Sequence, residues 1–109
     1  MKPIDVLAAF LKSYEAKDID AIAALLADDV HLQDWNLEAH GKAAVLAETL
    51  KNFREAAQLQ IRVRQFFEGH QCAAARLRIV VNNSVELEVV DTIELDLDGK
   101  VRSIRAYKG

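Results

Sequence analysis

Near-perfect alternation between Val85 and Leu97 constrains the fold of this chain more than any other feature. A β-strand sends successive side chains to opposite faces, so the pattern predicts a long strand with one buried face. Asp91 interrupts the apolar phase, and a carboxylate on a buried face is costly unless it is paired or neutralised. The apolar phase otherwise holds Val85, Leu87, Val89, Ile93, Leu95 and Leu97.

A second carboxylate occupies an apolar phase earlier in the chain. Val30, Leu32 and Asp34 share one phase of a shorter alternating segment, and His31 and Gln33 share the other. Two such aspartates in one small domain predict a polar site inside an apolar cavity. The alternative interpretation is a pair of structural aspartates with satisfied hydrogen bonds.

Length and composition exclude several classes of protein. A chain of 109 residues fits one domain, 1–109. The net charge of -3 argues against a nucleic-acid partner, which requires a basic surface. Lys2 is the only basic residue near the N-terminus, and Asp5 interrupts any apolar run. We therefore expect no signal peptide, no membrane partner and a cytoplasmic location. A lone cysteine, Cys72, excludes an internal disulfide.

The order of predicted elements indicates an α+β fold. Apolar residues recur at helical spacing over 4–14, Asp18 is a good N-cap for a short second helix, and a third helix follows Gly41. Three N-terminal helices should then pack on the apolar face of a curved, mostly antiparallel sheet. Strands are expected at 30–34, 59–64, 73–81, 85–97 and 100–107, with turns at 82–84 and 98–99.

This order of elements, together with several short segments, resembles the ketosteroid isomerase branch of the nuclear transport factor 2-like superfamily. The resemblance runs from about Val6 to Lys108 and implies a cone-shaped α+β barrel. It also implies that Asp34 is a general base and that Asp91 is a protonated hydrogen-bond donor. The segments that carry it are 17–22, 26–30, 33–34, 41–45, 90–91, 99–101 and 103–106.

The chain departs from the family pattern at two positions. Phe10 stands where the family has a tyrosine, and Trp35 stands where it has a proline. Losing one oxyanion donor costs about 2.7–4 kcal/mol, so we expect little steroid isomerisation. Tyr14 lies one helical turn beyond Phe10, about 6 Å along the axis. It is either a displaced donor or, more simply, a core aromatic with its hydroxyl at the cavity rim.

Five residues are candidates for ligand binding, although core packing explains the aromatic ones equally well: Phe10, Tyr14, Trp35, Phe53 and His40. His40 precedes the third helix, in a segment expected to border the cavity mouth. The histidines at 31, 40 and 70 match no helical metal motif, so we expect no metal site. Proton transfer also requires no cofactor.

Two classes of function remain open. The first is a cofactor-independent acid–base enzyme of isomerase, dehydratase, cyclase or hydrolase type, acting on a small apolar molecule through Asp34 and Asp91. The second is a non-catalytic ligand-binding or dimerisation domain that has lost the chemistry. We expect a homodimer, because a cavity depletes an already small core and the family precedent is dimeric. The arginines and glutamates on the polar strand faces should form cross-strand ion pairs.

Overall fold

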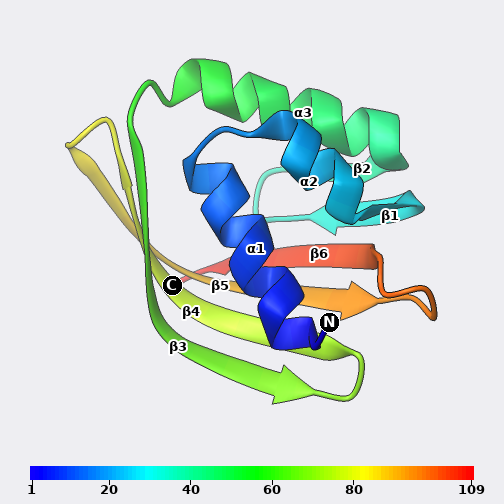
Figure 1. The fold of residues 1–109 in the computed structure, drawn as a ribbon. Coiled ribbons are helices and arrows are strands. Elements are labelled where there is room, and N and C mark those ends of the chain that lie inside the picture. Colours follow the sequence, from blue (N-terminus) through cyan, green and yellow to red (C-terminus); the bar gives the residue numbers. More distant parts are fainter.

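A computed structural model describes residues 1–109 as three helices on a six-stranded sheet (Figure 1). The sheet order is β2-β1-β6-β5-β4-β3, and β1–β6 is the one parallel pair. The predicted α+β architecture is confirmed, and the sheet stays open, with β2 and β3 as its edges. The elements are α1 (Pro3–Glu15), α2 (Ile19–Leu25), β1 (Leu26–Gln33), β2 (Glu38–His40), α3 (Lys42–Glu55), β3 (Leu59–Gly69), β4 (Cys72–Val81), β5 (Val85–Leu95) and β6 (Val101–Lys108).

The core lies between the helices and one face of the curved sheet. Helix α1 crosses this face and contacts β3, β4 and β5 (Figure 1). Its buried residues recur at helical spacing, as a one-sided helix requires: Val6, Leu7, Phe10 and Leu11. Helix α3 contacts β1 and β2 instead, and buries Val45, Thr49 and Phe53. The helices therefore enclose the sheet face that carries the alternating apolar residues.

The segment between α2 and α3 contains two strands, where the sequence predicted one. Strand β1 begins at Leu26, earlier than expected, and pairs with the short strand β2. In this hairpin His31 lies opposite His40, and Gln33 lies opposite Glu38. A three-residue strand is too short to show a period, which is why the alternation did not reveal it.

A β-bulge at Arg64 reverses the alternation of β3. Val63 pairs with Leu77, but the next pair is Gln65 with Arg76, so Arg64 is the extra residue. After the bulge, Phe66 packs against the core and Phe67 is 49% exposed. The sequence had left open which of these two phenylalanines faces inward, and the bulge decides it.

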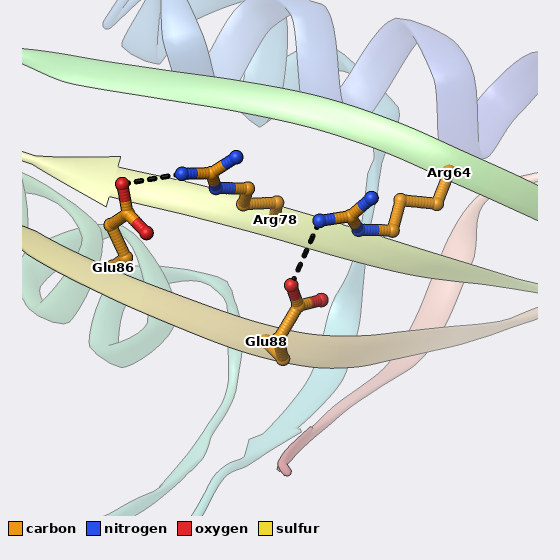
Figure 2. Close-up of polar contacts among 4 residues, drawn as sticks. All are labelled: Arg64, Arg78, Glu86 and Glu88. Carbon is orange, nitrogen blue, oxygen red and sulfur yellow. Dashed lines mark hydrogen bonds and ion pairs between the residues drawn. The ribbon is translucent and has the colours of Figure 1, made fainter.

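The outer face of the sheet carries the predicted cross-strand ion pairs. Figure 2 shows Arg64 reaching from β3 across β4 to Glu88 on β5, with Nη2 and Oε1 3.0 Å apart. Arg78 on β4 pairs diagonally with Glu86 on β5. All four side chains are exposed, so these pairs contribute little stability and require no ligand to explain them.

The end of β5 differs from the prediction. The strand stops at Leu95, and Asp96 accepts hydrogen bonds from the backbone N–H groups of Asp98 and Lys100. Leu97 was expected on the buried face but is 92% exposed in this turn. An Asx-type turn overrode the alternation, because its side-chain hydrogen bonds compete with the ladder.

Candidate functional site

Asp34 and Asp91 lie on opposite sides of Ala106. Asp91 pairs with Ala106 across β5 and β6. On the other side of β6, Gln33 pairs with Arg105, so Asp34 follows at the level of Ala106. Two strand spacings, about 10 Å, thus separate the two backbone positions. The small side chain of Ala106 leaves the space between the carboxyl groups open.

The two carboxyl groups share one cavity of about 330 Å³. Sixteen of its 22 lining residues are hydrophobic, counting Tyr14, and Asp34, Asp91 and Asn52 are among the six others. The apolar wall comes from α1 and α3, from Leu32 on β1 and from β3 to β6. A few polar groups in an apolar enclosure can orient a ligand while excluding most of the water around it.

The environment of Asp91 favours its neutral form. Its neighbours on the same strand face, Val89 and Ile93, are both buried. Desolvation by burial raises the pKa of Asp91 from 3.8 to about 7, and the negative charge of Asp34 acts in the same direction. Near neutral pH, Asp91 therefore exists in both its protonated and its ionised form.

A turn, and not the strand itself, positions Asp34. Strand β1 ends at Gln33, and Asp34 Oδ1 accepts hydrogen bonds from the backbone N–H groups of Asn36 at 2.7 Å and Leu37 at 2.9 Å. Its own N–H donates to the carbonyl oxygen of Leu37 at 3.0 Å. One carboxylate oxygen thus anchors the turn, while the residue still lines the cavity.

Tyr14 contributes a third oxygen to this cavity. Its ring packs between Phe10, with centroids 5.9 Å apart, and Phe53, at 5.0 Å. Asn52 Nδ2 donates a hydrogen bond to Tyr14 Oη at 3.1 Å. Burial raises the pKa of Tyr14 above 10.0, and the charges of Asp91 and Asp34 add to the effect. The phenol therefore keeps its proton at neutral pH.

The structure separates the five candidate ligand-binding residues into two groups. Phe10, Tyr14 and Trp35 line the cavity with Asp34 and Asp91. Trp35 is 43% exposed, which places it at the opening. Phe53 packs against the ring of Tyr14 and is not among the residues that line the cavity. His40 also lies outside, because β2 turns its side chain to the outer face, opposite to the buried Ala39.

The sequence analysis missed the cavity residue Asn52 and the grouping of His31 and His40 with Glu38. Asn52 lies three residues after Thr49 on the inward stripe of α3, and a polar residue on such a stripe could have indicated it. His31, Glu38 and His40 converge across the β1–β2 hairpin. The signal for this cluster was the Glu38-x-His40 spacing, which aligns both side chains on one face once β2 is known to be a strand.

Residues 7–104 match the model of the SnoaL-like domain. The chain belongs to the SnoaL-like domain family. This membership agrees with the expected nuclear transport factor 2-like resemblance. Comparison with curated proteins finds no significant match to this SnoaL-like chain.

Solved structures share the fold of this SnoaL-like domain at low identity. A Kribbella flavida protein provisionally assigned as a ketosteroid isomerase has a TM-score of 0.84 and 19% identity, over 98% of this chain and 77% of that one. A Mycobacterium tuberculosis epoxide hydrolase of the LEH-like type has a TM-score of 0.83 and 17% identity, over 98% of this chain and 82% of that one. A Sinorhizobium meliloti protein provisionally assigned as a polyketide cyclase has a TM-score of 0.84 and 14% identity, over 94% of this chain and 93% of that one.

Proposed function

We propose that this SnoaL-like domain binds one small, mainly apolar molecule in its cavity and catalyses a proton transfer on it. The observation that carries the proposal is the convergence of Asp34, Asp91 and Tyr14 on one apolar cavity. The pKa of Asp91 is raised to about 7, the pKa of Tyr14 is raised above 10.0, and Asp34 Oδ1 accepts two N–H donors. Environments that shift the pKa values of titratable groups decide which group can donate a proton and which can accept one.

In the proposed step, the carboxylate of Asp34 removes a proton from a carbon next to a substrate carbonyl. The electrons of that C–H bond move to the carbonyl oxygen, which becomes an oxyanion. Protonated Asp91 donates a hydrogen bond to this oxygen. Tyr14 can donate as well, because Asn52 donates to its oxygen and leaves the phenolic proton free. Donors fixed in an apolar site stabilise such charge strongly.

The later fate of the proton determines the class of reaction. Return of the proton to another carbon gives isomerisation. Loss of a leaving group from the neighbouring carbon gives dehydration, and attack of the enolate on a second carbonyl gives cyclisation. In epoxide hydrolysis, Asp34 would instead take a proton from a water molecule as that water attacks a ring carbon, and protonated Asp91 would give a proton to the epoxide oxygen as its C–O bond breaks. The isomerase, hydrolase and cyclase assignments of proteins with this fold are compatible with all four outcomes.

We also propose that the protein is a homodimer that uses the outer face of the sheet. Two pairs of apolar residues point outward on this face, Phe67 with Ala74 and Val90 with Tyr107, and the two pairs are diagonal neighbours across β4 and β5; we call them the outer apolar band. Phe67 is 49% exposed and Tyr107 is 53% exposed, which leaves a large apolar surface uncovered.

None of the three helices has the length and apolarity needed to cross a bilayer.

A non-catalytic ligand-binding domain is the second candidate. Phe10 favours it, because the oxyanion donor expected from the family is absent at that position. The turn at Asp34 favours it too, since the two backbone hydrogen bonds give this carboxylate a structural role without any substrate. Under this alternative, the cavity binds a ligand but does not transform it.

Trp35 provides a direct way to distinguish the two candidates. It is the only tryptophan of the chain and it lines the cavity, so its fluorescence reports on cavity occupancy. The test compares the wild type, Asp34→Asn and Asp91→Asn with a 3-oxo-Δ5-steroid, a β-hydroxy ketone and an alkyl epoxide. Binding is followed by Trp35 fluorescence, and product is followed by absorbance or chromatography.

We expect at least one probe to be turned over by the wild type. Asp34→Asn should lower that rate by at least about 100-fold while ligands still change the Trp35 signal. Binding without turnover in the wild type would support the non-catalytic candidate. Equal turnover in the wild type and Asp34→Asn would overturn the assignment of Asp34 as the base.

A further inference from the structure

Two histidines and a glutamate form a compact cluster on the outer face of the β1–β2 hairpin. Glu38 Oε1 lies 2.8 Å from His31 Nε2 and 3.1 Å from His40 Nε2. The ligand atoms of the three side chains all lie within 4.8 Å of one another. The two imidazole rings are stacked, with centroids 4.4 Å apart and an interplanar angle of 14°. Both rings thus direct a nitrogen toward the same carboxylate.

The backbone fixes this arrangement. His31 and His40 are directly opposed across the antiparallel pair, and Glu38 is two residues from His40 on the same strand. Directly opposed and i, i+2 side chains share one face of a sheet, so all three project together. Buried Ala39 points to the other side, toward the core. Because the backbone already places the three side chains together, their rotation alone can adjust the distances among the two imidazoles and the carboxylate.

We propose that His31, Glu38 and His40 form a binding site for a divalent transition metal ion of the Zn²⁺ class. Zn²⁺ binds imidazole nitrogen at about 2.0–2.1 Å and carboxylate oxygen at about 2.0–2.2 Å, which places tetrahedral ligands about 3.3 Å apart. The observed spacings of 2.8 and 3.1 Å from Glu38 to the two histidines are close to this value. The nearly parallel rings must splay slightly for both nitrogen lone pairs to meet one ion.

The donor set indicates which ions fit. Two imidazole nitrogens with one carboxylate suit Zn²⁺, Cu²⁺, Ni²⁺ and Co²⁺, whereas Mg²⁺ and Ca²⁺ require oxygen ligands. Three protein ligands leave at least one coordination position for water. The site is accessible, because the side chains of His40 and Glu38 are 73% and 49% exposed.

This site is separate from the cavity and does not depend on the proposed function. His31 has the opposite orientation on β1 to Leu32, which lines the cavity. The two strands nevertheless enclose the turn of residues 34–37, which holds Asp34. A bound ion would link β1 to β2, the two strands that flank this turn, and would stabilise the short edge strand β2.

The test is calorimetric titration of the untagged protein with Zn²⁺, compared across four variants. His40→Ala and Glu38→Gln alter exposed side chains, and His31→Ala removes the third ligand. His70→Ala is the matched control, since His70 is exposed and remote from the cluster. We expect one ion per chain, with the affinity at least about tenfold weaker in each cluster variant and unchanged in His70→Ala.

A second readout keeps the result independent of folding defects in any one variant. Zn²⁺ should raise the melting temperature of the wild type and of His70→Ala, because an ion that binds only the folded state stabilises it. Co²⁺ should give a visible absorption band that His40→Ala abolishes. Absence of Zn²⁺ binding, or equal binding by the wild type, Glu38→Gln and His40→Ala, would overturn the proposal.

Discussion

Asn52 on α3 donates a hydrogen bond to the phenolic oxygen of Tyr14 on α1, with Nδ2 and Oη 3.1 Å apart. The contact joins two helices that meet the sheet at different strands, and both residues line the cavity. It also determines the role open to Tyr14. Because the phenolic oxygen of Tyr14 accepts a hydrogen bond from the amide of Asn52, its own O–H proton points away from Asn52. That proton is free to donate into the cavity that Tyr14 lines.

The titration of Tyr14 tests this contact. In Tyr107→Phe, Tyr14 is the only tyrosine, and its ionisation can be followed by near-ultraviolet absorbance. We expect ionisation above 10.0, because burial opposes the phenolate. Adding Asn52→Ala should raise the pKa further, since the amide donor stabilises the phenolate. A midpoint at or below 10.0 would contradict the burial of this hydroxyl.

Replacing Asp91 with asparagine should stabilise the protein above neutral pH. Its pKa is about 7 when folded, against 3.8 for an ordinary aspartate. Between these values the folded state holds a proton that the unfolded state has lost, so the free energy of unfolding falls as pH rises. This loss of free energy of unfolding levels off above pH 7 at no more than about 4.5 kcal/mol, from about 1.4 kcal/mol per pKa unit.

Thermal melting of Asp91→Asn across the pH range checks this sign. The variant should match the wild type near pH 4 and melt about 5 °C higher or more at pH 8, at about 4–8 °C per kcal/mol for a domain of this size. Asp98→Asn, in an exposed turn, is the control and should show no such divergence. A variant that is less stable than the wild type at pH 8 would mean that ionised Asp91 has a stabilising partner.

Lys17 should contribute to stability through the end of α3. Its Nζ donates to the carbonyl oxygens of Phe53 at 3.1 Å, Ala57 at 3.0 Å and Ala56, which are close to the C-terminal end of the helix. Helix ends leave such carbonyl groups without intrahelical partners. Lys17→Met should therefore lower the free energy of unfolding by about 1.5–3 kcal/mol.

Urea denaturation of Lys17→Met measures this loss. Lys17 has a φ angle of 57°, and methionine carries the same backbone strain, so the comparison isolates the amine. Lys51→Met, on the exposed face of α3, controls for the loss of one positive charge. Equal stability of the two variants would show that solvent satisfies these carbonyl groups without Lys17.

The sequence predicted the α+β fold because the fold depends on periodic patterns, and the same patterns singled out Asp34 and Asp91, which both line the cavity. Val89, Asp91 and Ile93 share a phase that no turn or bulge interrupts. The failures occur where a local feature changes the phase. Arg64 adds a bulge, the Asp96 turn ends β5 before Leu97, and β2 is too short to show a period.

The candidate site was only partly predictable, because side-chain convergence depends on strand pairing. Asn52 and Tyr14 are 38 residues apart in the chain and meet only once α1 and α3 are placed. His31 and His40 meet because the β1–β2 register opposes them. Spacing along the sequence carries no information about either contact.

Phe10→Tyr should increase steroid isomerisation. Phe10 lines the cavity one helical turn from Tyr14, and tyrosine would place a hydroxyl where the wild type has none. We expect the wild type to convert a 3-oxo-Δ5-steroid slowly and Phe10→Tyr to be faster by about tenfold or more. Ultraviolet absorbance of the conjugated product measures both rates. Efficient wild-type turnover would show that Tyr14 or another group already supplies the donor.

Sedimentation at micromolar concentration tests the proposed homodimer. We expect a dimer for the wild type, and a monomer for Phe67→Glu, because this change places a charge in the outer apolar band. Leu97→Glu, which alters a side chain that is 92% exposed and lies outside the band, should remain dimeric. A wild-type species of 12.2 kDa would refute the proposal.

The position of Ala106 between the two carboxyl groups has a consequence for how such a cavity can diversify. The β5–β6 ladder places Asp91 beside Ala106, and the turn after β1 holds Asp34 through its backbone hydrogen bonds, so a side-chain change at position 106 leaves both of these anchors in place. Larger residues at position 106 would instead fill the gap and shorten the ligand that fits. Ligand size and the spacing of the two carboxyl groups can therefore evolve independently in this scaffold.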